Sequence, residues 1–171
     1  MKLYSVRTSA DGNAIILIFT ETLSDSSTPA LSDFSISVDG TAAAPTLITI
    51  TGNSVVLTPA TAIANGSNVS LSYTGTALQD LASTPNAAAA LSDISVDNNV
   101  LDTTAPAFLS AESNTAGTLI SLNYDESFLS TSLPLASDFT ITAADQSFTP
   151  ASVTVDGSSV SLDLTNDPLN N

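Results

Sequence analysis

The chain reads Ser32-Asp33-Phe34-Ser35-Ile36-Ser37-Val38 over residues 32–38, and every second side chain from Phe34 onward is large and apolar. Side chains two positions apart lie on the same face of a β-strand, so this run predicts a strand with one face on a core and the other in water. The same alternation recurs along most of the chain, with serine and threonine at many of the intervening positions. We therefore expect an all-β fold.

A second copy of this run lies 105 residues further along, as Ser137-Asp138-Phe139-Thr140-Ile141. At the same offset, Gly52-Asn53-Ser54-Val55-Val56-Leu57 aligns with Gly157-Ser158-Ser159-Val160-Ser161-Leu162. Between residues 3 and 58, 17 of 56 positions are identical to the residue 105 positions later, without a gap. A register held over this length indicates an internal duplication, and it predicts two copies of one structural unit.

Turn residues divide the first copy into short apolar blocks. The expected strands cover residues 3–9, 13–20, 33–38, 45–51, 53–58, 68–75 and 92–96. Dipeptides such as Asp39-Gly40 and Asn65-Gly66, which favour tight turns, separate several of them. This number of strands in about 100 residues is typical of an immunoglobulin-like sandwich. We expect tandem immunoglobulin-like antiparallel β-sandwiches, one over residues 1–99 and one over residues 100–171.

The second sandwich is expected to be incomplete. Position 171 aligns with position 66, so the second copy has no counterpart of residues 67–96, which hold two of the expected strands. Both ends of the sequence look cut from a longer array. Two explanations are open: the sequence is part of a larger protein, or another chain supplies the absent strands by β-augmentation.

The composition excludes several classes of function. The chain has no cysteine and no histidine, which removes thiol nucleophiles, imidazole bases, disulfides and the usual zinc sites. We expect no catalytic residue, no bound organic cofactor and no enzymatic activity. Two basic residues against 17 acidic ones leave a net charge of −15, which argues against partners such as nucleic acids or anionic membranes. No apolar run approaches the roughly 18 residues needed for membrane insertion.

The remaining ionic groups are carboxylates, which suit hard cations and above all calcium. The junction between the copies reads Asp97-Asn98-Asn99-Val100-Leu101-Asp102. The predicted calcium ligands are Glu21, Asp80, Asp97, Asn99 and Asp102, with Asp11 as a further candidate and Glu126 in the place of Glu21 in the second copy. The alternative is a solvated linker whose aspartate and asparagine residues close turns.

Several short motifs follow one another in a characteristic order. They are Leu17-Ile18-Phe19-Thr20-Glu21-Thr22-Leu23, Ser32-Asp33-Phe34-Ser35-Ile36, Gly52-Asn53-Ser54-Val55-Val56-Leu57-Thr58, Val69-Ser70-Leu71-Ser72-Tyr73-Thr74, Ala77-Leu78-Gln79-Asp80 and Asp102-Thr103-Thr104-Ala105-Pro106. In this order the chain resembles the immunoglobulin-like tandem repeat of large bacterial surface proteins, the cyanobacterial long-protein or SwmB-type repeat. One departure is Leu81-Ala82-Ser83-Thr84-Pro85-Asn86, where the family usually has a small residue, glycine and asparagine.

The resemblance implies an elongated extracellular array that serves as an adhesin stalk or a surface layer. We therefore expect a structural spacer of a large secreted or cell-surface protein, whose partners are neighbouring repeats of the same protein. Two other interpretations are kept. The first is a filament subunit with homotypic assembly by strand exchange. The second is a ligand-binding accessory or decoration domain of an extracellular enzyme or virion.

Overall fold

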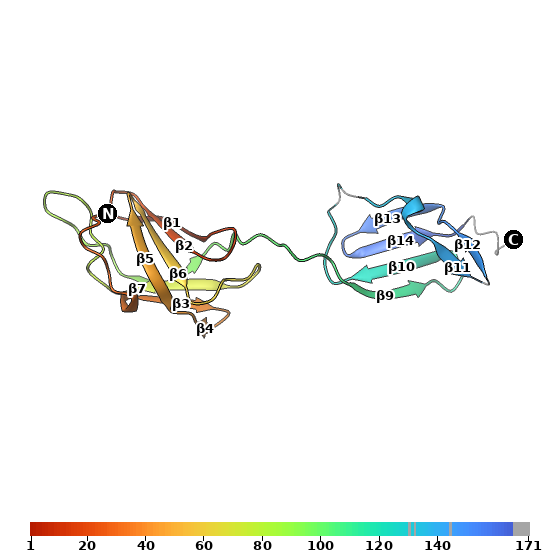
Figure 1. Cartoon of the computed structure of the whole chain (residues 1–171), viewed down its shortest axis with the longest axis horizontal. Helices are drawn as coiled ribbons and strands as arrows, with labels where there is room; N and C mark the ends of the chain where they lie inside the picture. Colours follow the sequence, from red (N-terminus) through yellow and green to blue (C-terminus); the bar gives the residue numbers. More distant parts are fainter. Residues whose placement is uncertain (130, 132, 144, 166–171) are drawn as a thin grey trace. The chain divides into compact units, whose positions relative to one another are not determined.

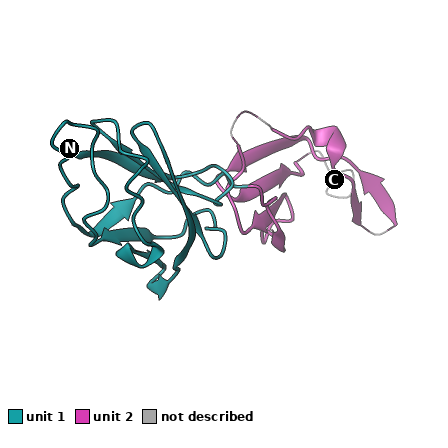
Figure 2. Ribbon diagram, turned by 60° about the vertical axis from the view of Figure 1, so that its left-hand side comes forward, with its two compact units in different colours: residues 1–102 teal, residues 103–171 magenta. Residues whose placement is uncertain are grey.

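The computed structural model describes residues 1–129, 131, 133–143 and 145–165. The chain divides into two compact units, residues 1–102 (unit 1) and residues 103–171 (unit 2), which Figure 2 shows in different colours. The division lies after Asp102, a little beyond position 99, because hydrogen bonds hold the intervening residues on unit 1. The Leu101 amide donates to the Ala10 carbonyl at 2.9 Å, and Asn65 Nδ2 donates to the Val100 carbonyl at 2.6 Å.

Unit 1 is a sandwich of two antiparallel four-stranded sheets (Figure 1). The first sheet has the order β1-β2-β6-β5, formed by β1 (Leu3–Thr8), β2 (Ile15–Phe19), β6 (Ser54–Pro59) and β5 (Pro45–Thr51). The second has the order β4-β3-β7-β8, formed by β4 (Thr41–Ala42), β3 (Phe34–Val38), β7 (Val69–Tyr73) and β8 (Leu91–Val96). A single 3₁₀ turn, η1 (Leu31–Asp33), leads the chain into β3.

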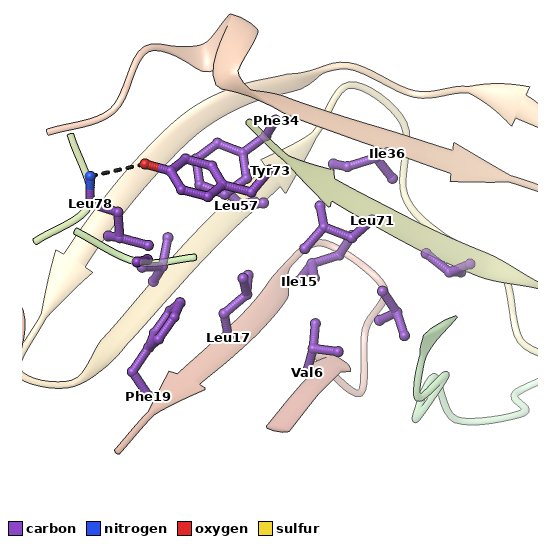
Figure 3. Packing of buried hydrophobic residues seen from close by; sticks show 14 of the residues in the cluster. Val6, Ile15, Leu17, Phe19, Phe34, Ile36, Leu57, Leu71, Tyr73 and Leu78 are labelled. Atoms are coloured by element: carbon purple, nitrogen blue, oxygen red, sulfur yellow. Dashed lines mark hydrogen bonds between the residues drawn. The ribbon is translucent and has the colours of Figure 1, made fainter. Parts of the chain in front are cut away.

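The core of unit 1 lies between the two sheets, and alternate side chains of the strands point into it (Figure 3). Its fully buried residues are Ile15, Leu17, Val55, Leu57, Leu71, Tyr73 and Leu78. The Tyr73 ring packs on Phe34, with ring centroids 4.7 Å apart. The Tyr73 hydroxyl accepts a hydrogen bond from the Leu78 amide at 2.9 Å, drawn as a dashed line in Figure 3. Tyr73 therefore joins β3, β7 and the segment that follows β7.

Unit 2 repeats only part of this architecture. Its main sheet has the order β13-β14-β10-β9, formed by β13 (Ser152–Asp156), β14 (Ser159–Asp163), β10 (Leu119–Tyr124) and β9 (Phe108–Ser113). A separate hairpin follows the turn η2 (Ala136–Asp138) and consists of β11 (Ile141–Ala143) and β12 (Gln146–Phe148). At the offset of 105 these elements are the counterparts of β1 to β6. Within its described residues, unit 2 contains no counterpart of β7 or β8.

Burial differs between the units accordingly. Among the described residues of unit 2, the buried apolar residues are Val160, Leu162, Leu164 and Pro150. The apolar side chains around them are only partly buried: Ile120, Leu122, Tyr124, Phe128, Phe139, Ile141, Phe148, Val153 and Val155. A single sheet and one hairpin cover these residues less completely than two full sheets do.

The structure confirms the predicted all-β fold of sandwich repeats. Each of the expected strands in the first copy is present, with bounds that agree within two residues at either end. The sequence did not predict β4, because Thr41-Ala42 is too short to show alternation. The Asp39-Gly40 turn has positive φ at both residues, 51° and 80°, as such a tight turn requires. Among the described residues, no helix is long and apolar enough to cross a membrane.

Candidate functional site

Two of the five predicted calcium ligands, Glu21 and Asp80, lie at the end of unit 1 where β1 begins. The Glu21 carboxylate pairs with the Met1 ammonium at 2.7 Å. The hydrogen bond that this ammonium group donates to Glu21 raises its pKa, and the charge of Asp80 adds to the effect. In this structure, a cation of the chain itself thus lies beside both carboxylates.

Asp80 is buried and organises the loop that follows β7. Its carboxylate accepts hydrogen bonds from the Asn86 amide at 2.9 Å, from Asn86 Nδ2 at 3.0 Å and from the Ala82 amide at 3.2 Å. These bonds, the Asn86 amide first among them, lower the pKa of Asp80. The segment that departs from the family pattern, residues 81–86, is therefore closed by a buried carboxylate rather than by a glycine turn.

The other three predicted ligands, Asp97, Asn99 and Asp102, belong to the segment that leaves unit 1 at the opposite end of β1, where Asp97 pairs with Arg7. The Thr8 amide donates to the Asp97 carbonyl at 2.9 Å, and the Asp97 amide donates to the Val6 carbonyl at 3.2 Å. The side chains of Asp97, Asn99 and Asp102 are all exposed. A strand of six residues spans about 20 Å, so β1 separates this group from Glu21 and Asp80.

The five predicted ligands therefore do not converge on one calcium ion. Among the described residues, no group of three or more aspartate, glutamate, histidine or cysteine side chains is placed to hold a metal. Asp11, the further candidate, is bound by its own turn, where hydrogen bonds from the Ser9 hydroxyl and then from Asn13 lower its pKa to about 2. Calcium binding by part of this set stays a prediction.

Asn98 was not among the predicted ligands, but its hydrogen bonds hold the junction, residues 97–102, on unit 1. Its Nδ2 donates to the carbonyls of Ala64 and Ser67, each at 2.9 Å. Its Oδ1 accepts from the Val100 amide at 3.1 Å and from the Thr8 hydroxyl at 3.4 Å. No sequence signal separates Asn98 from its acidic and amide neighbours, because three of its four partners lie more than 30 residues away.

Unit 2 presents a second candidate site, which we call the open face and define by the partly buried side chains of Ile120, Leu122, Phe139 and Ile141. Phe139 and Ile141 are the counterparts of Phe34 and Ile36, which β3 buries against β7 in unit 1. Among the described residues, β11 pairs with β12 alone. One edge of β11 and the apolar side chains behind it are thus available to a further strand.

An apolar loop accompanies the open face. Leu129, Leu133 and Leu135, in the segment between β10 and η2, are 76%, 59% and 67% exposed. Their counterparts in unit 1 are Ser24, Thr28 and Ala30. Three exposed leucines in one loop are an unusual apolar feature for a chain otherwise rich in hydroxyl groups.

Solved structures and one family model are similar to parts of this chain. No curated protein matches the chain. Among solved structures, the N-terminal part of the bacterial S-layer protein SbsC is similar with a TM-score of 0.46 and 19% identity, over 67% of this chain and 26% of that one. Domains 1–6 of surface layer protein SbsC are similar with a TM-score of 0.47 and 19% identity, over 67% of this chain and 15% of that one.

The chain therefore spans about a quarter or less of the length of these S-layer structures. The family match lies in unit 1, where residues 2–77 fit the model of the SWM repeat. These residues run from the start of β1 to just beyond β7. Residues 2–77 thus match the SWM repeat, described as a flagellar system-associated repeat, which confirms the SwmB-type resemblance.

Proposed function

We propose that the chain is a structural spacer within a large secreted or cell-surface protein, where it contributes length to an adhesin stalk or surface layer. The observation that carries the proposal is the repetition of one sandwich pattern at an ungapped offset of 105 residues, together with the SWM repeat match. In tandem arrays each unit contacts mainly its neighbours, so length and stability grow by addition. The partners of this chain would then be the adjoining repeats of the same protein.

The backbone connections of unit 1 support a role under tension. The chain enters the unit along β1 and leaves it through Asp97, which forms a parallel bridge with Arg7. A pull on the two ends of unit 1 would therefore slide two parallel segments past each other. The Asp97–Val6 and Thr8–Asp97 backbone hydrogen bonds and the Asn99 amide bond to Thr8 Oγ1, at 2.8 Å, all resist this motion.

The surface chemistry is compatible with an exposed array. Strand side chains that do not face the core are largely serine and threonine, and the net charge is −15. A high charge of one sign keeps copies apart and soluble.

Single-molecule force spectroscopy of the whole chain, held at its two ends, tests the proposal. We expect unit 1 to unfold in one step that releases about 3.5 Å of length per residue. Asn98→Ala should lower the unfolding force of unit 1, because forced unfolding is governed by the unfolding rate and this variant removes the bonds that fasten residues 98–100.

Asn99→Ala is the matched control, since the Asn99 side chain is exposed and next in sequence. It should leave the unfolding force close to that of the unchanged chain. Gradual extension of unit 1 at low force, without a cooperative step, would contradict the proposal that unit 1 is a spacer under tension.

A further inference from the structure

One turn of unit 1 joins an asparagine to a glycine, a pair that occurs nowhere else in the sequence. Asn65 is the only asparagine of the chain that is followed by glycine, and both residues are exposed. They are the two central residues of a turn that the Ser67 amide closes on the Ala64 carbonyl at 3.4 Å. Gly66 has a φ of 76°, a left-handed value that glycine adopts without strain. The turn therefore favours glycine at the position that follows Asn65.

The backbone nitrogen of Gly66 is accessible. Among the described residues, no group accepts a hydrogen bond from the Gly66 amide. Beyond the neighbours of Gly66 in the chain, no atom lies within 4 Å of the position that a Cβ would occupy. A backbone amide that follows an asparagine can attack the side-chain carbonyl carbon and close a five-membered ring. Because a side chain on the attacking residue hinders this approach, ring closure at Asn65 is the least hindered in the chain.

The same turn holds the junction on unit 1. Asn65 Nδ2 donates a hydrogen bond to the Val100 carbonyl at 2.6 Å. The Ala64 and Ser67 carbonyls, on either side of the two central residues, each accept a hydrogen bond from Asn98 Nδ2 at 2.9 Å. A chemical change at Asn65 therefore affects three hydrogen bonds: one through its own donor, and two through the backbone that positions the acceptors.

We propose that Asn65 is a site of spontaneous deamidation and that this reaction releases the junction from unit 1. The Gly66 nitrogen forms a bond to Asn65 Cγ, the Cγ–Nδ2 bond breaks, and ammonia leaves with the proton of the Gly66 amide. Water then opens the ring at either of its two carbonyl groups, which gives aspartate or isoaspartate at position 65. Nothing is oxidised or reduced, and water is the only co-reactant.

Both products weaken the hold on the junction. Each has a carboxylate in place of the Nδ2 donor, so the Val100 carbonyl loses its hydrogen bond and faces a negatively charged group. Isoaspartate also adds one carbon atom to the backbone of the turn, which displaces the two carbonyls that Asn98 binds. The inference does not depend on the spacer role, because the reaction needs only this turn and water.

Incubation of the unsubstituted chain in mildly alkaline buffer tests the reaction. Peptide mass spectrometry that distinguishes isoaspartate from aspartate follows each asparagine separately. Asn68 is the internal control, because it is also exposed but is followed by the β-branched Val69 of β7. We expect Asn65 to convert at least roughly tenfold faster than Asn68, since the branched side chain hinders ring closure.

The converted chain, which ion-exchange chromatography separates by its additional negative charge, tests the release of the junction. In the unconverted chain the amides of Asn99, Val100 and Leu101 donate hydrogen bonds at 2.8, 3.1 and 2.9 Å. After conversion we expect these amides to exchange with solvent at least about fivefold faster, the factor that corresponds to one lost hydrogen bond. Exchange in β2 and β6 should not change.

Two variants separate the reaction from its consequence. Asn65→Gln keeps an amide side chain, but its ring closure would give a six-membered ring, which forms far more slowly. The incubation should therefore leave residue 65 and the exchange of the three junction amides unchanged in this variant. Asn65→Asp has one of the two products from the start, and its junction amides should exchange faster without any incubation.

Three results would overturn the proposal. The first is conversion of Asn65 no faster than that of Asn68 in the unsubstituted chain. The second is a converted chain whose amides at residues 99–101 exchange as slowly as before. The third is the same loss of protection in incubated Asn65→Gln, which would show that another reaction releases the junction.

Discussion

The two units carry the same alternating pattern, but only unit 1 buries it completely. Ile15 and Leu17 are fully buried on the inner face of their sheet, whereas their counterparts Ile120 and Leu122 are partly buried. The strands that bear these residues pair in the same order in both units. The difference teaches that alternation selects which face of a sheet is apolar, while burial depends on the presence of a second full sheet.

The units also differ at the end of β10, where unit 2 has larger side chains. Tyr124 makes edge-to-face contacts with Phe108 and Phe128, at centroid distances of 5.8 and 4.8 Å. The counterparts in unit 1 are Phe19, Leu3 and Leu23. Aromatic pairs of this geometry contribute about 0.5–1.5 kcal/mol of stability beyond the contribution of the area that they bury. Unit 2, whose second sheet is short, gains stability from these local contacts.

The sharpest way to test the comparison is to truncate one matched leucine in each unit. Leu17→Ala should destabilise unit 1 by about 2–5 kcal/mol, because it leaves a cavity in a fully buried site. Leu122→Ala should cost unit 2 clearly less, because Leu122 is only partly buried. Hydrogen exchange read by mass spectrometry in increasing urea reports each unit separately. Equal losses in the two units would show that the open face is packed as tightly as the core of unit 1.

A smaller loss of stability is expected from Tyr73→Phe, which removes one hydroxyl oxygen from β7, a strand with no counterpart in the described part of unit 2. The Leu78 amide would lose its acceptor inside the core, and an unsatisfied buried donor costs about 1–3 kcal/mol. The free energy of unfolding of unit 1 should fall by that amount and the protection of unit 2 should not change. An unchanged unit 1 would mean that the Leu78 amide finds another partner.

The smallest expected effect is the contribution of Asp80 to the stability of unit 1 as the pH falls. The pKa of Asp80 is lowered in the folded state, above all by the Asn86 amide, so its contribution to stability is present above the unfolded pKa of about 3.9 and is lost as the pH falls through the folded value. Asp80→Asn should therefore weaken unit 1 at neutral pH, and its difference from the unchanged chain should shrink below about pH 4. Urea midpoints measured between neutral pH and pH 2 check this. A difference that is constant with pH would show that Asp80 acts only through its shape.

Asp80→Asn should change the stability of unit 1 and leave unit 2 unaffected. The segment that contains Asp80 follows β7 and has no counterpart in the described part of unit 2. Hydrogen exchange in β10 and β14 should therefore be the same in the variant and in the unchanged chain. An altered exchange there would mean that the two units are energetically coupled.

The predicted calcium site shows where reasoning from sequence stopped. Glu21 and Asp80 do lie at one end of unit 1, and Asp97 and Asn99 do lie together at the other. Sequence spacing could not reveal that β1 separates the two groups. Each residue of a strand adds about 3.3 Å to the distance between the two ends of the strand. Asn98 was missed for a related reason: its acceptors belong to residues 64 and 67, which only the fold brings near.

Local chemistry was enough to establish the strands, the turns and the duplication, because side-chain alternation and positive-φ glycines act within a few residues. The pattern around Phe34 and its repeat around Phe139 are therefore visible in the sequence alone. The pairing of β3 with β7, the burial of Tyr73 and the division of the carboxylates between two ends depend on contacts between distant segments. Such contacts form only when the sheets close on each other, so only the tertiary structure showed which of the alternating side chains are fully buried.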